Sequence, residues 1–396
     1  MKEGWTYKKL GELFPIVMGK TPPRNVSRYW DEKKETNNLW VSIADLSKYE
    51  GKEIHETKEH ISDEGKQGIK QIPKGSLLVS FKLTLGKMAF AGEKLYTNEA
   101  IMSLQRRDDV DLVFLYYYFS FLDWNKIASG NEKVKGKTLN KKSLSEIPVA
   151  YIPLMEQHSI VAHFDAAFAH IDALKANAEK QLAEARQLFQ AELAECMRPK
   201  EGWEEKTLGE IATDIYRGSG IKRDQITKEG TPCVRYGEIY TTYNVAFDDC
   251  VSHTCAEIIQ SPKYFEYGDL LFAITGESVE DIGKTIAYLG KDKCLLGGDI
   301  ICMKHKQNPK FLSYALSTPD AIRQKGIGKT KLKVVHTNAP ALKAISIPIP
   351  PINIQQSIVS RLDALSANIK KLEEVQRKTL AECDALKQAM LREVFE

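Results

Sequence analysis

The chain has 396 residues, 43% of them hydrophobic, and a formal net charge of only +3. This length fits two or three ordinary domains with their own cores, and the near-neutral charge excludes a uniform coat of lysine. No apolar run reaches about 18 residues and the start MKEGWTYKK is no signal peptide, so we expect a soluble, cytoplasmic protein without a membrane partner. The seven cysteines form no CxxC pair, which predicts neither a disulfide framework nor a metal site.

The first 150 residues predict a mixed segment of short strands and helices. A loop at residues 19–23 ends a short start, and the alternating stretch 38–45 predicts a strand. Residues 75–80 and 88–91 predict two further strands, and the apolar stretch 111–122 predicts a buried helix.

Residues 153–198 predict one long helix, because they lack internal Gly and Pro and their apolar residues recur at three- and four-residue steps. The predicted seam consists of Ile160, Phe164, Ile171, Leu174, Ala178, Leu182, Ala185 and Phe189. At roughly 1.5 Å per residue the helix would reach about 65 Å. Such a seam needs a partner, since helices in water are stabilised mainly by burying their apolar face.

The second half of the chain repeats the first at an offset of 198 residues. Residues 2–5 and 200–203 both read KEGW. Strands are predicted at 231–236, 268–273 and 285–288, and a helix at 309–316. A second long helix follows at 351–396, with its seam at Ile358, Leu362, Leu365, Ile369, Leu372, Cys383, Leu386 and Met390.

We therefore predict an α+β protein of two tandem units. Its globular domains are residues 1–150 and 199–348, and its long helices are residues 151–198 and 349–396. The short connections favour an antiparallel helix pair, a coiled coil with internal pseudo-two-fold symmetry.

Lysines cluster at corresponding places in the two halves. The clusters are Lys126, Lys133, Lys135, Lys137, Lys141 and Lys142, and Lys325, Lys329, Lys331 and Lys333. Each lysine alone could be ordinary solvated charge. The duplication beside a glycine favours contact with the phosphates of nucleic acid.

Patterns that suggest an enzyme fail on inspection. Gly328-Lys329-Thr330 and Gly283-Lys284-Thr285 lack the first glycine of a P-loop. The stretch NPKF at 308–311 departs from the N-P-P-F loop of adenine methyltransferases, and no Ser/His/Asp order stands out. We expect no catalytic residue and no metal ligand in this chain.

Two stretches resemble the specificity subunit of type I restriction-modification systems. Residues 328–359, GKTKLKVVHTNAPALKAISIPIPPINIQQSIV, combine a glycine loop, Asn before a Leu-x-x-Ile step, and Ile-Pro-x-Pro-Pro leading into a Gln-Gln helix. Residues 144–161 repeat this pattern, with Tyr151-Ile152-Pro153 where the family usually shows two adjacent prolines. The Gly-Trp-x-x-x-x-Leu-Gly-Glu opening of each half is also similar to that family.

The resemblance implies a non-catalytic subunit in which two target recognition domains each read one half of a bipartite double-stranded DNA site. The helix pair would act as a ruler between them. Its partners would be two methyltransferase subunits, which bring S-adenosylmethionine, and restriction subunits, which use ATP and magnesium. None of these cofactors is expected to bind this chain.

Base contacts are expected in loops that differ between the halves, since the half-sites generally differ. The candidates are Lys20, Thr21, Arg24, Lys82 and Lys87, and Lys222, Arg223, Arg235, Tyr236, Thr275 and Lys284. Arg can bridge O6 and N7 of guanine, and Lys can reach the same acceptors. Arg235 could instead form a structural salt bridge and Tyr236 could pack in the core, while Asn140 and Asn338 are expected to cap helices.

Two other functions compete with this one. A scaffold that holds two sugar- or protein-binding modules apart would explain the repeat and the helices, but not the lysine clusters or the family motifs. The recognition subunit of a fused restriction enzyme of another type would differ only in its partner.

Overall fold

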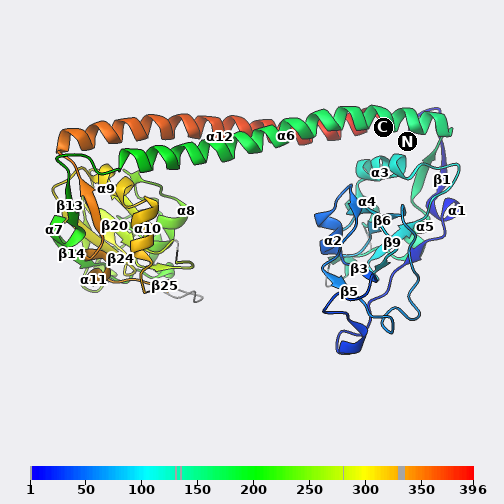
Figure 1. Cartoon of the computed structure of the whole chain (residues 1–396), viewed down its shortest axis with the longest axis horizontal. Helices are drawn as coiled ribbons and strands as arrows, with labels where there is room; N and C mark the ends of the chain where they lie inside the picture. The colour runs from blue at the N-terminus through cyan, green and yellow to red at the C-terminus, as the bar shows by residue number, and fades with distance from the viewer. Residues whose placement is uncertain (1, 130–131, 134–135, 280, 329–334) are drawn as a thin grey trace. The chain divides into compact units, whose positions relative to one another are not determined.

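The computed structural model describes residues 2–129, 132–133, 136–279, 281–328 and 335–396, with the backbone alone at 132–133 and 136–137. The chain divides into two compact units, Met1–Ala178 with Lys378–Glu396, and Glu179–Arg377. Each unit holds one set of short strands and helices together with part of each long helix (Figure 1).

Two sheets form the first unit's globular part. The central sheet has the order β2 (Val17–Met18), β9 (Ile101–Leu104), β6 (Leu77–Ser80), β7 (Met88–Ala91) and β4 (Glu53–Ile54). The second sheet has the order β5 (Glu59–His60), β3 (Leu39–Val41) and β8 (Tyr96–Thr97). Two separate antiparallel pairs are β1 (Thr6–Lys9) with β12 (Pro148–Tyr151), and β10 (Glu132–Lys133) with β11 (Gly136–Lys137). The helical segments are α1 (Leu10–Leu13), η1 (Ser27–Tyr29), α2 (Ile43–Lys48), α3 (Leu112–Phe121), α4 (Trp124–Ile127) and α5 (Lys141–Ser145).

The second unit repeats this plan. Its central sheet has the order β14 (Ala212–Arg217), β24 (Ile300–His305), β20 (Leu270–Ala273), β22 (Thr285–Tyr288) and β17 (Ala246–Phe247). Its second sheet has the order β15 (Ile226–Thr227), β18 (Ser252–Thr254), β16 (Thr231–Val234), β23 (Cys294–Leu296) and β19 (Tyr264–Phe265). The short pairs are β13 (Glu204–Thr207) with β26 (Ser346–Ile349), and β21 (Thr275–Gly276) with β25 (Val335–His336). The helical segments are α7 (Leu208–Ile211), η2 (Arg223–Gln225), α8 (Tyr236–Thr241), η3 (Ala256–Ile258), α9 (Pro309–Ala315), α10 (Pro319–Lys325) and α11 (Ala339–Lys343).

The central strands are apolar on both faces because each face is covered. Along β6, Leu77 and Val79 pack with the helix α3, while Leu78 packs in a separate cluster with β3 and α2. In the second unit, Leu270 and Phe272 pack with α9 and Leu271 packs with α8 and β16. Figure 1 shows α3 and α9 between these strands and the long helices. The helix α3 or α9 therefore joins each sheet to a long helix.

The predicted strands and short helices are confirmed, with two overruns: the strand predicted at 231–236 ends at Val234, before α8 begins at Tyr236, and the strand predicted at 38–45 is also too long. Residues 38–45 do not stay extended, because β3 ends at Val41 and α2 begins at Ile43. Ser42 ends the strand as a helix cap whose side chain accepts a hydrogen bond from the Asp45 N–H, while Asp45 accepts one from the Ser42 N–H.

The long helices α6 (Leu154–Cys196) and α12 (Ile352–Phe395) pass through both units and lie side by side in each (Figure 1). In the first unit, Lys175 Nζ lies 2.7 Å from Asp384 Oδ1, and Lys387 Nζ lies 2.5 Å from Asp172 Oδ1. The second unit continues the order with the pairs Gln181–Gln376, Arg186–Glu373 and Glu192–Arg361. Residue numbers fall along α12 as they rise along α6, so the predicted antiparallel pair is confirmed.

One heptad-spaced row of each long helix is buried, the period of a coiled coil. The rows are Gln157, Phe164, Ile171, Ala178 and Ala185 on α6, and Gln355, Leu362, Gln376 and Cys383 on α12, where Ile369 of the same row is half-buried. The prediction that Leu174 and Leu386 lie in the seam is wrong, since they are 55% and 50% exposed. Each follows a buried residue by three positions, on a flanking row that two helices alone cover only in part.

The helix seam predicts a strong contrast between two leucines of the second unit. Leu362 is fully buried, whereas Leu188 is 56% exposed. Leu362→Ala should lower the free energy of unfolding by about 2–5 kcal/mol, because it removes transfer energy and leaves a cavity. Leu188→Ala should cost less than about 1 kcal/mol. Urea denaturation followed by circular dichroism measures both, and equal losses would contradict the assignment of the seam.

Candidate nucleic-acid interface

The globular part of the second unit carries an open groove of about 940 Å³. Its polar side chains include Arg217, Arg223, Arg235, Tyr236, Glu238 and Asp299. Glycines supply much of the remaining lining, which leaves backbone accessible. Three guanidinium groups around accessible backbone suit the acceptor-rich edges and phosphates of DNA.

Three chain segments form this groove, each beyond the end of a strand. β16 and β23 run parallel, so their carboxyl ends meet at one edge of the sheet. The segment after β14 joins them there, because the Ser219 N–H donates to the Leu296 carbonyl at 2.9 Å. At Gly218 a Cβ would come within 2.1 Å of the Gly297 carbonyl oxygen, so this approach requires glycine.

A carboxylate orients Arg235 in the groove. Arg235 Nε donates to Glu238 Oε1 at 3.2 Å, so the salt bridge considered for Arg235 exists. Glu238 is buried and also accepts from the Arg235 N–H and from Ser252 Oγ, which fixes its carboxylate. Among the described residues, Nη1 and Nη2 of Arg235 have no hydrogen-bond partner. The salt bridge therefore holds the guanidinium while leaving its outer edge available.

A second hollow of about 400 Å³ adjoins the groove, and both are lined by Tyr236, Gly237 and Thr241. Tyr236 is 41% exposed, so the alternative that it packs in the core is wrong. Thr275 lines this second hollow, and its Oγ1 lies 3.2 Å from His336 Nδ1.

The remaining candidates of the second unit differ in exposure. Lys222 and Arg223 are exposed where η2 begins. Lys284 is half-buried, and its Nζ donates to the Tyr243 carbonyl at 3.1 Å. Burial lowers the pKa of the Lys284 ammonium.

The first unit repeats the groove's framework with different side chains. β3 pairs parallel with β8 as β16 does with β23, and Ser42 caps the following helix where Arg235 does in the second unit. Asp45 and Glu238 correspond as well, since each is buried and accepts from the capping residue's N–H, at 2.9 and 3.0 Å. The two capping residues stand 193 positions apart, so the sequence offset of 198 does not match them.

Lys20, Thr21 and Arg24 follow β2 in the first unit. Thr21 donates to Glu99. Arg24 pairs with Glu59, and its guanidinium lies 4.0 Å from the centre of the Trp30 ring. Lys20 is exposed beside a hollow of about 320 Å³.

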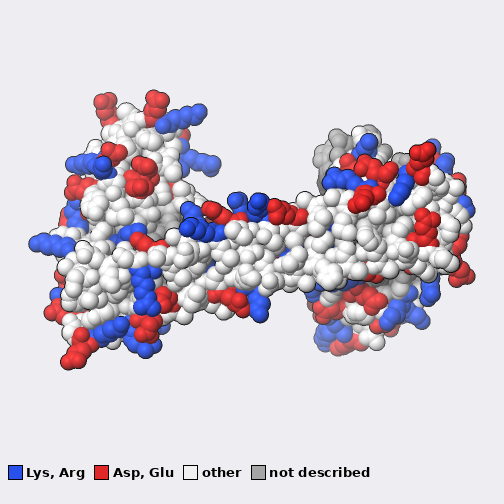
Figure 2. Space-filling view, turned by 90° about the horizontal axis from the view of Figure 1, so that it is seen from above, with Lys and Arg blue, Asp and Glu red and all other residues white. Residues whose placement is uncertain are grey.

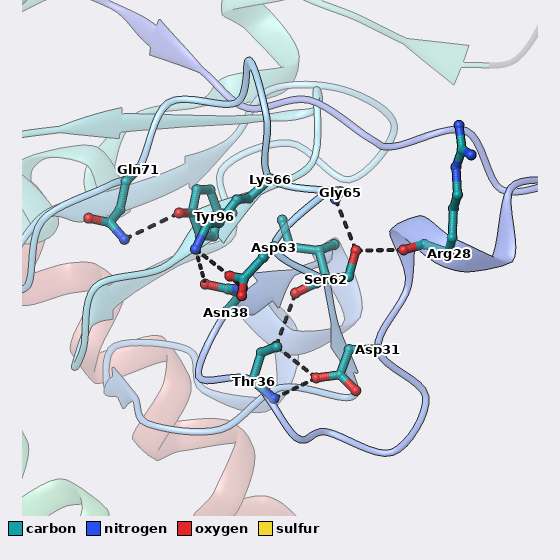
Figure 3. Close-up of polar contacts among 11 residues, drawn as sticks. Arg28, Asp31, Thr36, Asn38, Ser62, Asp63, Gly65, Lys66, Gln71 and Tyr96 are labelled. Carbon is teal, nitrogen blue, oxygen red and sulfur yellow. Dashed lines mark hydrogen bonds and ion pairs between the residues drawn. The ribbon is translucent and has the colours of Figure 1, made fainter.

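A polar network fixes two loop segments of the first unit, residues 31–38 and 62–66 (Figure 3). Lys66 Nζ bonds to Asp63 Oδ1 at 2.5 Å, and Asn38 Nδ2 donates to the same oxygen at 3.0 Å. Within the earlier segment, Asp31 Oδ2 accepts from the N–H and the hydroxyl of Thr36, both at 2.7 Å. These bonds hold both loop segments against the strands and lower the pKa of both carboxyls.

Lys82 and Lys87 occupy the places that Thr275 and Lys284 take in the second unit. Lys82 forms an isolated antiparallel β-bridge with Thr138, and Thr275 pairs with His336 in the corresponding way. The carbonyls of Lys87 and Lys284 accept from matching strand residues, Ser80 and Ala273. Lys87 Nζ is bound to Glu50 Oε2 at 2.5 Å.

Most of the lysine clusters cannot be described. Lys135, Lys329, Lys331 and Lys333 lie outside the described residues, as do the side chains of Lys133 and Lys137. Lys325 does not belong to an exposed cluster, because it is buried and its Nζ donates to the Leu316 carbonyl at 2.8 Å. Asn140 and Asn338 cap α5 and α11 as predicted, with side-chain oxygens that accept from Ser143 and Ala341.

Surface charge is mixed where it can be seen. Figure 2 shows Lys and Arg interspersed with Asp and Glu over both units on the face that it displays. Among the described residues, no group of three or more His, Cys, Asp or Glu could hold a metal ion. Within the same residues, none of the helices has the length and apolarity needed to span a membrane.

The repeated two-sheet domain, its groove and the antiparallel helix pair define a class of tandem binding proteins built on a helical spacer. The family model for the "Type I restriction modification DNA specificity domain" matches residues 2–184 and 200–382. The chain therefore belongs to this family and carries two copies of its domain. The resemblance found in the sequence is confirmed.

Known relatives agree with this membership. The MjaIX specificity subunit of a type I restriction enzyme from Methanocaldococcus jannaschii is 24% identical over 306 residues, 70% of this chain and 67% of the relative. A chain from a solved type I R-M system aligns over 100% of this chain and 98% of its own length, with a TM-score of 0.75 at 19% identity. The HsdS subunit from Thermoanaerobacter tengcongensis aligns over 100% and 97%, with a TM-score of 0.54 at 20% identity. These structures share the fold.

Lys325 gives the second unit a defined pH dependence. Burial without a carboxylate partner lowers the pKa of its ammonium to about 7. The unfolded chain then binds more protons than the folded chain between that pH and about 10.5, so stability should rise with pH across this window. We expect Lys325 to contribute a slope on the order of 1 kcal/mol per pH unit from pH 7.5 to 9.5. Buried thiols whose pKa is raised, such as those of Cys196 and Cys233, oppose it in the upper part of this window, so urea denaturation measures the contribution as the difference between the original chain and a Lys325 variant.

Lys325→Met should remove this slope and stabilise the second unit at pH 7, since residue 127 of the first half is already apolar, Ile127. Lys343→Met is the matched control, because Lys343 is exposed, and it should leave the slope unchanged. Equal slopes in the original chain and in Lys325→Met would show that Lys325 does not contribute.

Proposed function

We propose that the chain reads the two halves of a bipartite duplex-DNA target with its two reader domains. We define these as the strand-bearing parts of the units and give them the bounds 1–150 and 199–348. The observation that carries the proposal is a duplicated framework with unlike side chains at one position, Ser42 in the first domain and Arg235 in the second. A shared framework with different side chains suits two different half-sites.

The chain would make two kinds of contact with DNA, one to phosphates and one to bases. Lys133, Lys135 and Lys137, with Lys329, Lys331 and Lys333, would bind phosphates, which set affinity and its salt dependence. Bases would be read by Lys20, Thr21, Arg24, Lys82 and Lys87 in the first domain and by Lys222, Arg223, Arg235, Tyr236, Thr275 and Lys284 in the second. Arg235 suits guanine, because the outer nitrogens of its guanidinium match the O6 and N7 acceptors.

The chain acts as a non-catalytic recognition subunit of a type I complex. Its partners are two methyltransferase subunits and the restriction subunits, and the chemistry of methylation and cleavage takes place on them. We propose that this assembly works in the cytoplasm. The alternative of a sugar- or protein-binding scaffold gains no support, since the matched family is a DNA-specificity family.

Arg235→Ala tests the reading of the second half-site. In the full methyltransferase complex it should weaken methylation about 10- to 100-fold, the worth of a bidentate base contact. It should also relax sequence preference at one base pair of the second half-site, as sequencing of methylated genomic DNA would show. Lys304→Ala is the control, because Lys304 forms an ion pair with Asp269 away from the groove lining. Equal loss of preference in both half-sites would assign Arg235 to phosphate binding or to the fold.

Lengthening the helix pair tests the ruler. Seven residues inserted after Ala178 and seven after Arg377 keep the heptad register and add about 10 Å of helix. The gap between half-sites should lengthen by up to about three base pairs, at 3.4 Å per base pair along the duplex axis. Mapping of methylated sites at all gap lengths would show the change. An unchanged gap would contradict the ruler.

A further inference from the structure

A buried glutamine connects the first reader domain to α6. Gln157 is fully buried, and its Oε1 accepts from the Asp111 N–H at 2.8 Å. Its Nε2 donates to the carbonyls of Asp109 and Ile152, at 3.1 and 2.8 Å. Asp111 is the cap of α3, so the amide fixes the start of that helix against the long helix.

The second reader domain has the same joint. Gln355 is fully buried, its Oε1 accepts from the Asn308 N–H at 2.9 Å, and Nε2 donates to Gln307 Oε1 and to the Pro350 carbonyl. Asn308 caps α9, which corresponds to α3. Both ends of each side-chain amide are therefore used in binding the same helix start.

A second bond lies about two helical turns farther along each long helix. Tyr117 Oη donates to Asp165 Oδ1 at 2.6 Å in the first unit, and Tyr314 Oη donates to Asp363 Oδ1 at 2.8 Å in the second. Two separated bonds restrict rotation of α3 or α9 on its long helix, which one bond would permit. Apolar packing alone tolerates small shifts, whereas a buried amide left without partners is costly.

These joints are alike in the two units although the grooves differ. A feature common to both halves serves a requirement that both halves share, and base sequence is not such a requirement. The requirement that both halves share is a fixed orientation of each reader domain on its long helix. The helices α3 and α9 carry that orientation, because Phe114 and Phe311 pack beneath the central sheets of their domains.

We propose that Gln157 and Gln355 are positioning residues for gap selectivity: they fix each reader domain on the spacer so that only one distance between half-sites is accepted. The proposal rests on the proposed function, a bipartite target read by two domains. It separates two properties of recognition, since half-site sequence would depend on the grooves and the accepted gap would depend on the joints as well as on helix length.

The test uses the full chain co-expressed with its methyltransferase partner, and sequencing of methylated genomic DNA. Gln157→Met with Gln355→Met keeps side-chain length but removes every bond of both amides. Sites with the same two half-sites and a gap one base pair shorter or longer should gain methylation about tenfold, as expected when buried hydrogen bonds that favour one geometry are lost. Half-site sequences should stay unchanged.

Gln376→Met is the matched control on α12. Gln376 is also buried but bonds to Gln181 within the helix pair, so its loss should leave the accepted gap unchanged. If the double variant does not accumulate as a folded protein, Tyr117→Phe with Tyr314→Phe removes the tyrosine bond of each joint and keeps the rings, and it should broaden the gap in the same direction. In the second unit Lys310 of α9 still pairs with Asp363, so Lys310→Met is added there.

Three results would overturn the proposal: a single unchanged gap in the variants, altered half-site sequences, or loss of all methylation with an unaltered thermal unfolding curve. Failure of the proposed function would look different, because the unmodified complex would then show no bipartite pattern at all.

Discussion

The architecture depends on a side-chain amide buried between each globular domain and a long helix. Gln157 and Gln355 use both ends of the carboxamide to bind the backbone before a short helix, and that helix carries the central sheet. Hydrogen bonds in a dry site are directional and costly to break. A domain attached in this way keeps one orientation on its helix, which contact between apolar surfaces alone would not ensure.

The two units share this framework and differ in the segments that directly follow the strands. The parallel pairs β3–β8 and β16–β23 bring strand ends to one edge, and the residue that caps the next helix lies there. The bond common to both units comes from the capping residue's backbone, because Asp45 or Glu238 binds its N–H, while the two capping side chains bond to these carboxylates in different ways. The side chain is then free to differ, and Ser42 and Arg235 show how much it does. The same edge can thus carry different side chains without a change of fold.

Much of this organisation could be predicted from the sequence, because it follows from periodicity and repetition. The absence of Gly and Pro from residue 154 to 196 and the regular apolar steps predict α6 to within two residues at its C-terminal end. Spacing alone places Leu174 and Leu386 in the seam, because it does not distinguish a buried row from the row beside it. In the sequence the joints show only as two glutamines 198 positions apart, Gln157 and Gln355, since nothing in the sequence shows which backbone groups they bind.

The groove was harder to predict. Arg235 and Tyr236 were found as candidates, but Arg217, Asp299 and Glu238 were missed because their grouping depends on pairing between distant strands. The match of Ser42 to Arg235 was hidden by loops of unequal length, which shift the offset from 198 to 193. The sequence places Lys325 in a lysine cluster expected to contact phosphate, because a lysine buried without an acidic partner runs against the usual distribution of that residue.

The first unit also has an unusual relation to chain order. Its core includes Leu391 and Phe395, and the ring of Phe395 lies 5.7 Å from that of Phe164 and 5.8 Å from that of Phe114. On the ribosome, these residues emerge after the entire second unit. The N-terminal domain therefore finishes folding last, when α12 returns to it, so a complex can assemble around a complete first unit only after translation has passed both halves.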